Sequence, residues 1–122
     1  MILSDAVYYT YRNNIILLIL AIISADQAVK DSGVDLDTLD KNRVGVIFGV
    51  GIGGIKTFED EVKYFGKNEE NGPKFNPFFI PKMIADIAAG QISINYGFHG
   101  PNYTSTSACA SSSNALADAF NL

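Results

Sequence analysis

The stretch Pro101-Asn-Tyr-Thr-Ser-Thr-Ser-Ala-Cys-Ala-Ser-Ser-Ser-Asn-Ala-Leu116 changes from residues that favour a strand to residues that favour a helix, and the change falls at Cys109. Before the cysteine, Thr104 and Thr106 favour extended backbone. After it, residues 110–120 place their apolar side chains at helical spacings. The stretch therefore predicts a strand, then a turn that carries the cysteine, then a helix that begins there.

Cys109 is the only cysteine of the chain, and its predicted position makes it a candidate nucleophile. At the start of a helix, free backbone N–H groups and the positive end of the helix dipole stabilise a thiolate, which is the attacking form. A buried and inert cysteine is the alternative, because free cysteines are among the most buried residues. Taken alone, a single cysteine favours that alternative, so its flanking sequence has to decide.

Three ordered motifs carry a resemblance that favours the nucleophile. They are Gly45-Val-Ile-Phe-Gly-Val-Gly-Ile-Gly-Gly54, the run 76–102 that opens with Asn76-Pro-Phe-Phe-Ile-Pro-Lys-Met-Ile84, and Gly100-Pro101 followed by Ala-Cys-Ala-Ser-Ser112. Together they resemble the β-ketoacyl-[acyl-carrier-protein] synthases, the condensing enzymes of the thiolase superfamily, and within them the elongating, type II branch. The resemblance covers roughly residues 24–122, whereas residues 1–23 form an atypical segment that matches nothing we can place in the family.

The resemblance implies an α/β fold, namely part of the N-terminal half of a thiolase-like layered fold in which helices cover a mixed sheet. The family's chain is much longer and builds its active site from two similar halves, so residues 24–122 resemble a partial N-terminal domain. In the family the strand before the cysteine pairs with its twin in a homodimer. Residues 102–107 are therefore expected to form an exposed sheet edge in a monomer, and such an edge invites association.

The resemblance also implies the chemistry of fatty-acid biosynthesis. Cys109 would attack an acyl thioester of acyl-carrier protein, with its own backbone N–H as half of an oxyanion hole. Malonyl-carrier protein would then lose carbon dioxide and condense with the acyl group. The family's two catalytic histidines come from the second half, so this chain alone is not expected to complete the reaction. No cofactor or metal is implied, and Ile52, Phe79 and Ile84 are the candidates for contact with the fatty chain.

Two other functions stay open at this point. One is a non-catalytic remnant or interaction module that pairs with a full-length synthase. The other is a thiolase that uses coenzyme A, which shares the cysteine at a helix start but would flank it differently. His99, the only histidine, is not expected to serve as the base. It reads as part of a turn before the strand, and seven or so extended residues would carry it about 20 Å from the sulfur.

The charge, the cysteine content and the apolar run of the chain bear on which partners and which cellular location are expected. A net charge of −4 and a pI near 4.7 argue against nucleic acid, for which a basic stripe is the usual footprint. A single cysteine fits a reducing cytoplasm. Residues 15–23 are continuously apolar, which admits a signal-peptide core or a membrane anchor as well as a buried helix. A bilayer crossing needs about 20 apolar residues, so we predict a buried helix that continues to a stop at Gly33.

The rest of the chain predicts a buried strand over residues 43–48, an amphipathic helix over 55–65 and a single helix over 81–96. The Asp-rich segment 34–42 is predicted as a solvated linker rather than a metal site, and residues 67–75 as a surface loop with a turn at Gly72-Pro73. Gly49, Gly51 and Gly54 have the G-x-G-x-x-G spacing of dinucleotide-binding proteins. We reject that function because the motif needs an acidic residue at the end of a following strand, whereas the segment 63–77 is polar, contains glycine and proline, and is not strand-like.

Overall fold

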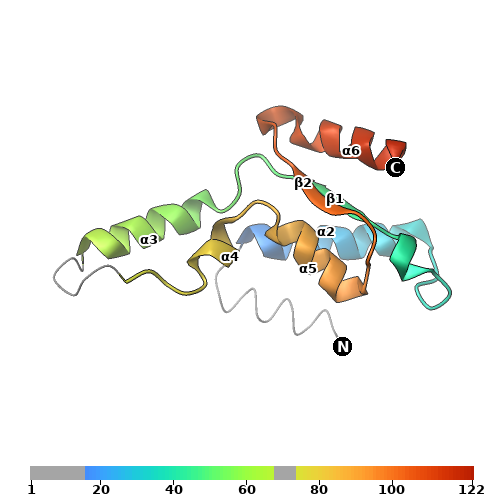
Figure 1. The fold of residues 1–122 in the computed structure, drawn as a ribbon, viewed down its shortest axis with the longest axis horizontal. Coiled ribbons are helices and arrows are strands. Elements are labelled where there is room, and N and C mark those ends of the chain that lie inside the picture. The colour runs from blue at the N-terminus through green and yellow to red at the C-terminus, as the bar shows by residue number, and fades with distance from the viewer. Residues whose placement is uncertain (1–15, 68–73) are drawn as a thin grey trace.

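The computed structural model describes residues 16–67 and 74–122. Ile15, the rest of the N-terminal segment before it and the turn predicted at Gly72-Pro73 lie outside the described residues. In chain order the elements are α2 (Ile16–Ser32), the 3-10 turn η1 (Lys41–Arg43), β1 (Val46–Gly49), α3 (Ile55–Lys67), α4 (Phe79–Met83), α5 (Ile87–Tyr96), β2 (Asn102–Ser105), the 3-10 turn η3 (Ala108–Ala110) and α6 (Ser111–Asn121) (Figure 1).

The two strands form a parallel pair in which Val46 lies opposite Asn102 and Gly49 opposite Ser105. In Figure 1, α6 lies on one side of this sheet, and α2 and α5 lie on the other. Parallel strands joined by a long helical crossover are the mark of an α/β fold, so the predicted fold class is confirmed: the structure is a partial α/β domain. In the described part of the chain β2 pairs with β1 alone, which leaves its second edge open, as expected for residues 102–105.

The strand predicted at residues 43–48 is shorter and less buried than expected. Residues 41–43 form the 3-10 turn η1, because the Asp40 side chain accepts the backbone N–H of Asn42 (3.1 Å) and so caps a turn there. All four residues of β1 are half-buried. Each strand of this two-stranded sheet has a neighbouring strand on one edge only, so neither strand is enclosed on both edges.

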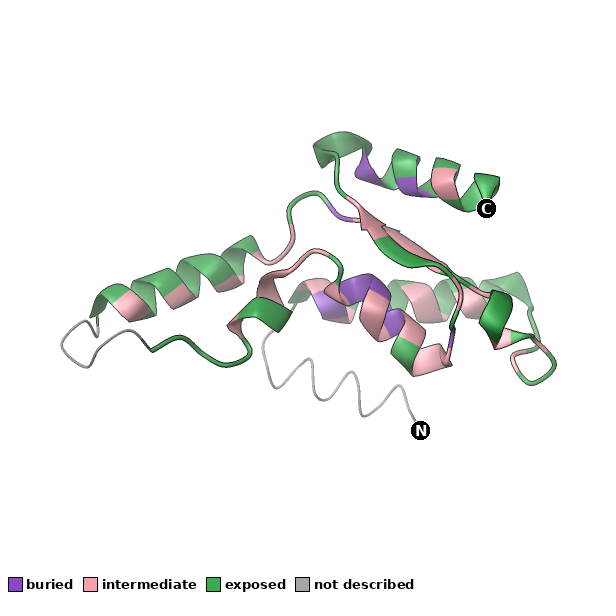
Figure 2. Ribbon diagram, in the orientation of Figure 1, coloured by how far each residue is buried: buried purple, intermediate pink, exposed green. Residues whose placement is uncertain are grey.

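The hydrophobic core lies between α2 and α5. It is built from five buried residues, with Val46 and Phe48 of β1 packed against them: Leu18, Ala21, Ile22, Ala88 and Ile92. Figure 2 shows the buried residues of these two helices where they cross. The apolar run at the start of α2 is buried on this face only, because Ile16 and Leu20 are 64% and 59% exposed. The prediction of a buried helix therefore holds for one face of it.

Helix α2 ends where the sequence predicts, at Gly33, whose φ of 66° is the left-handed value that glycine adopts without steric cost. The helix runs without interruption through residue 24, where the atypical segment was expected to give way to the family-like domain. Among the residues that the structure describes, none of the helices is long and apolar enough to cross a membrane.

The single helix predicted over residues 81–96 is wrong. The structure has two helices, α4 and α5, separated by a break at Ile84, whose ψ of 144° is extended. In a continuous helix the carbonyl of Met83 would accept the N–H four residues later. Here it accepts the N–H of Gly54 instead, at 2.9 Å, so a contact with a distant loop replaces the next helical hydrogen bond.

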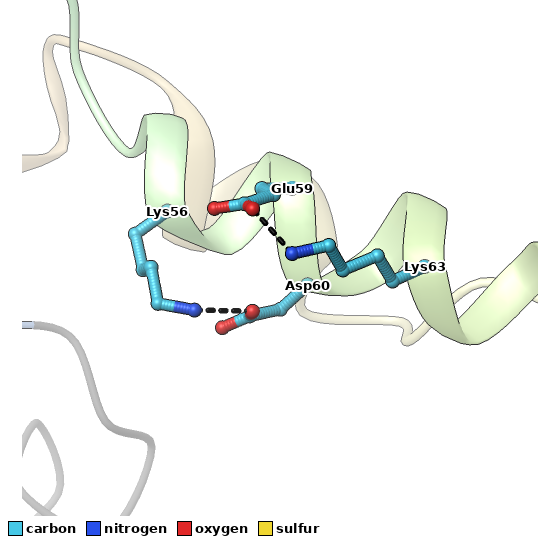
Figure 3. Close-up of polar contacts among 4 residues, drawn as sticks. All are labelled: Lys56, Glu59, Asp60 and Lys63. Atoms are coloured by element: carbon cyan, nitrogen blue, oxygen red, sulfur yellow. Dashed lines mark hydrogen bonds and ion pairs between the residues drawn. The ribbon is translucent and has the colours of Figure 1, made fainter.

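Helix α3 is amphipathic, as predicted. Its charged face carries two ion pairs one turn apart, between Lys56 and Asp60 and between Glu59 and Lys63 (Figure 3). The hydrogen bond to Asp60 raises the pKa of Lys56, and the bond from Lys63 lowers the pKa of Glu59. Exposed pairs of this kind add little stability, so they serve mainly to keep this face in water.

On the other face of α3, Phe58 stacks on Phe79 of α4 with ring centroids 6.3 Å apart.

Candidate functional site: the cysteine turn

Cys109 lies in the turn η3 between β2 and α6, and its side chain is exposed. The cysteine is therefore not buried, and its role as a nucleophile stays a prediction. The predicted order of strand, cysteine turn and helix is confirmed, but α6 begins at Ser111, two residues later than the sulfur. The thiol consequently stands on a separate short turn in front of the helix.

The residue before the cysteine has an unusual backbone. Ala108 has a φ of 50°, and it is the one non-glycine residue with positive φ in the described ranges. A side chain in the left-handed region is strained by about 1–2 kcal/mol. Strain of this kind persists only where surrounding contacts hold it. The contacts around Ala108 therefore decide the direction in which Cys109 points.

Three side-chain hydrogen bonds hold the turn. The backbone N–H of Ser107 donates to the hydroxyl of Ser111 (2.9 Å), which also lies 2.8 Å from the carbonyl oxygen of Ala108. The side-chain amide of Asn114 donates to the hydroxyl of Ser107 at 2.6 Å. The entry to the turn, at Ser107 and Ala108, is thus tied to the first turn of α6.

The end of β1 supports the same turn from below. Val50 is buried, and its N–H donates to the carbonyl of Ser105 at 3.1 Å, which extends the sheet toward the turn. A Cβ placed on Gly49 would lie 2.7 Å from backbone atoms of Ser111 and Ser112. Only glycine allows this strand to approach α6 so closely. Gly49 of the glycine motif therefore helps to position the cysteine turn.

The three candidates for contact with a fatty chain lie close together. Ile52 and Ile84 line one shallow hollow of about 400 Å³ with four other residues, Ile55, Phe58, Met83 and Ala85. Phe79 does not line it but stacks on Phe58, which does. Ile52 is 70% exposed, so an apolar surface is available there. The role of these residues in substrate binding stays a prediction.

Two glycines bring the loop that carries Ile52 against α4. Gly53 has a φ of 90°, and a Cβ at that position would lie 2.7 Å from the carbonyl oxygen of Met83. A Cβ on Gly54 would lie 2.4 Å from the carbonyl oxygen of Lys82. The absence of side chains at these two positions therefore allows close backbone packing of the loop on α4. Between α3 and β2 the described residues contain no strand.

His99 is exposed and lies before β2, whereas Cys109 follows that strand. Its backbone N–H donates to the carbonyl of Lys41 at 2.9 Å, so the residue belongs to the turn at the other end of the sheet. The predicted separation of the histidine from the sulfur is confirmed. That His99 takes no part in activating Cys109 stays a prediction.

Ser107, Ser111 and Asn114 were not singled out from the sequence. The available signal was the run of serines on both sides of the cysteine, because serine and asparagine side chains near a helix start often bond to local backbone. That run does not show which serine side chain points into the protein. The choice depends on the approach of Gly49 and Val50, which are far away in sequence.

Comparisons with known proteins bear on the family of the chain. The family model for the N-terminal domain of β-ketoacyl synthases matches residues 17–122. A 3-oxoacyl-[acyl-carrier-protein] synthase 2 of Staphylococcus aureus is 42% identical over 103 residues, which cover 84% of this chain and 25% of the relative. The enzyme of the same name from Synechocystis sp. is 41% identical over 103 residues, covering 84% of this chain and 24% of the relative.

The chain thus spans about a quarter of the length of the curated relatives that it matches. The matched range contains the strand pair, the glycine loop and the cysteine turn described above, and it begins within α2. The chain therefore belongs to the β-ketoacyl synthase family, through a match to the N-terminal domain of that family.

Proposed function

We propose that this chain is the nucleophile-bearing part of a 3-oxoacyl-[acyl-carrier-protein] synthase of fatty-acid biosynthesis. Cys109 takes the acyl group from the thioester of acyl-carrier protein, and the carrier leaves as its free thiol. In the complete reaction the acyl-enzyme then condenses with malonyl-carrier protein, with loss of carbon dioxide. The observation that carries the proposal is the exposed thiol on a strained turn whose entry is held by side-chain hydrogen bonds from α6.

The geometry supports the acyl-transfer step. An exposed thiol at the surface is accessible to a carrier-bound thioester, and the backbone N–H of Cys109 is one donor for the oxyanion that forms on attack. The hollow between Ile52 and Ile84 supplies an apolar surface for the fatty chain. Together with Phe79, these residues are proposed to contact the acyl group.

The condensation step needs donors that stabilise the developing enolate. The family resemblance assigns that task to two histidines of the second half, whereas the one histidine here lies at the wrong end of β2. We therefore expect this chain by itself to be acylated but not to elongate the acyl group.

Acyl-carrier protein is the proposed partner, and a homodimer paired through the open edge of β2 is the proposed assembly. Unpaired N–H and C=O groups along such an edge favour strand addition. The proposed location is the cytoplasm, where a free thiol persists. The proposed domain division is an atypical segment 1–23 followed by the synthase domain 24–122.

The experiment that tests the function is acylation followed by intact mass spectrometry. The purified chain is incubated with acyl-carrier protein that bears a medium-length acyl group, and the modified residue is mapped by peptide analysis. We expect one acyl group on Cys109 and none on a Cys109→Ser variant. Absence of the adduct from a folded wild-type chain would favour a non-catalytic module instead. Formation of a 3-oxoacyl product after malonyl-carrier protein is added would refute the expected need for the second half.

A further inference from the structure

We infer that Ser111 is the positioning residue for Cys109: its buried hydroxyl fixes the turn that carries the thiol. This inference rests on the proposed function, because it concerns the reactivity of the same cysteine. Ser111 does not touch the substrate itself. Ser111 acts through the backbone of the turn.

The hydroxyl of Ser111 joins three separate parts of the chain. It accepts the N–H of Ser107 at 2.9 Å, lies 2.8 Å from the carbonyl oxygen of Ala108 and 3.0 Å from the carbonyl oxygen of Val50. A hydroxyl carries one proton and two lone pairs, so it accepts from Ser107 while it donates to one of the two carbonyls. The end of β1, the exit from β2 and the cysteine turn therefore meet at a single atom.

Ser111 is buried, whereas the two serines that follow it in α6 are exposed. Ser111 is 3% exposed, and it is the one buried polar residue in the described ranges. Ser112 and Ser113, next in the same helix, are exposed. A solvated serine exchanges its partners with water at little cost, whereas a buried hydroxyl bond has no such substitute. Among these three serines, Ser111 is therefore the one that can hold the turn geometry.

The strained residue explains why the turn needs this support. Ala108 in the left-handed region gains stability if it relaxes to an ordinary backbone conformation. The hydroxyl of Ser111 lies at hydrogen-bond distance from the carbonyl of Ala108, which adjoins its ψ angle, and accepts the N–H of Ser107, one residue earlier. Without the hydroxyl, the turn is free to relax. The thiol and N–H of Cys109 would then leave the orientation in which both meet the same thioester carbonyl.

The test compares two reactions of the same sulfur. Acyl transfer from an acyl-pantetheine thioester needs the thiol and the N–H of Cys109 together, whereas alkylation by iodoacetamide needs only the thiol. We expect Ser111→Ala to slow acyl transfer by about tenfold to a hundredfold while alkylation keeps its wild-type rate. Ser111→Thr, which retains a hydroxyl, should restore most of the transfer rate. Ser112→Ala is the matched control and should leave both reactions unchanged.

The outcomes separate the inference from the proposed function. Equal acyl-transfer rates in Ser111→Ala and wild type would overturn the inference. A parallel loss of both reactions, in proportion to lost folded protein in urea titrations, would overturn it too, because it would show a purely structural part. If wild-type chain accepts no acyl group, the proposed function fails. Hydrogen exchange then decides about Ser111: faster exchange of the Ser107 amide in Ser111→Ala supports the inference, and unchanged exchange overturns it.

Discussion

Replacement of Gly49 by alanine tests whether β1 and the start of α6 pack as closely as the structure shows. The added Cβ would lie 2.7 Å from the Cα and N of Ser112 and from the carbonyl carbon of Ser111. Carbon atoms in contact normally stay about 3.5–4.0 Å apart. Because these neighbours are backbone atoms, no side-chain rotation relieves the contact, and either the strand or the helix has to move.

The expected cost follows from two opposing effects. Overpacking of a tight contact destabilises a protein by about 1–3 kcal/mol. The smaller conformational freedom of alanine in the unfolded chain returns about 0.4–1 kcal/mol. The net expectation is a loss of about 1–2 kcal/mol of unfolding free energy, which for a domain of this size lowers the Tm by roughly 4 °C per kcal/mol.

Urea titration followed by circular dichroism measures this difference. The matched control is Gly51→Ala, two residues further along in the loop that follows β1, where an added Cβ would meet no atom within 4 Å. That variant should be as stable as wild type or slightly more so. Equal stability of the two alanine variants would refute the packing of β1 on α6, and with it the support that we assign to the cysteine turn.

Three further predictions concern single residues. Ala108→Gly should stabilise the chain by about 0.5–1 kcal/mol, because glycine adopts the φ of 50° without strain, whereas Ala110→Gly, at a φ of −90°, should destabilise it; urea titration that ranks them the other way would contradict the strain at Ala108. Gly90→Ala, inside α5 with no atom within 4 Å of the new Cβ, should raise stability by about 0.5–1 kcal/mol, and a lower Tm would show a closer neighbour than the structure has. Burial, and after it the carboxylate of Asp26, raises the pKa of Tyr96 above its ordinary 10.0. A raised folded pKa gives stability that is complete below the unfolded value and is lost as pH rises through the folded value, so the stability advantage of wild type over Tyr96→Phe should shrink in unfolding titrations above pH 10.0; a constant advantage would contradict the shift.

Local sequence signals predicted most of the helices and strands. The left-handed stop at Gly33 ends α2, the apolar spacing of residues 55–65 gives α3, and the strand, turn and helix around Cys109 follow in the expected order. These features depend on residues close together in the chain, where propensity and spacing carry the information. The exposure of Cys109 followed from the flanking motif rather than from the cysteine itself.

Contacts between distant segments account for what the sequence did not predict. The break between α4 and α5 arises because Gly54 takes the carbonyl of Met83, a pairing across 29 positions of sequence that no helical pattern contains. The inward turn of Ser111 likewise depends on Val50. The proximity of Ile52 and Ile84 was expected from the family resemblance, because their own spacing in the sequence gives no reason for it.

The most direct measurement of the central claim is the rate of acyl transfer to Cys109 from an acyl-pantetheine thioester near neutral pH, in the folded chain and in the same chain unfolded by urea. If the turn organises the thiol and its own N–H around one carbonyl, the folded chain should react faster than the unfolded one, and Ser111→Ala should lose that advantage. Equal rates in the folded and unfolded chains would contradict the claim, because the fold would then contribute nothing to the reactivity of the cysteine.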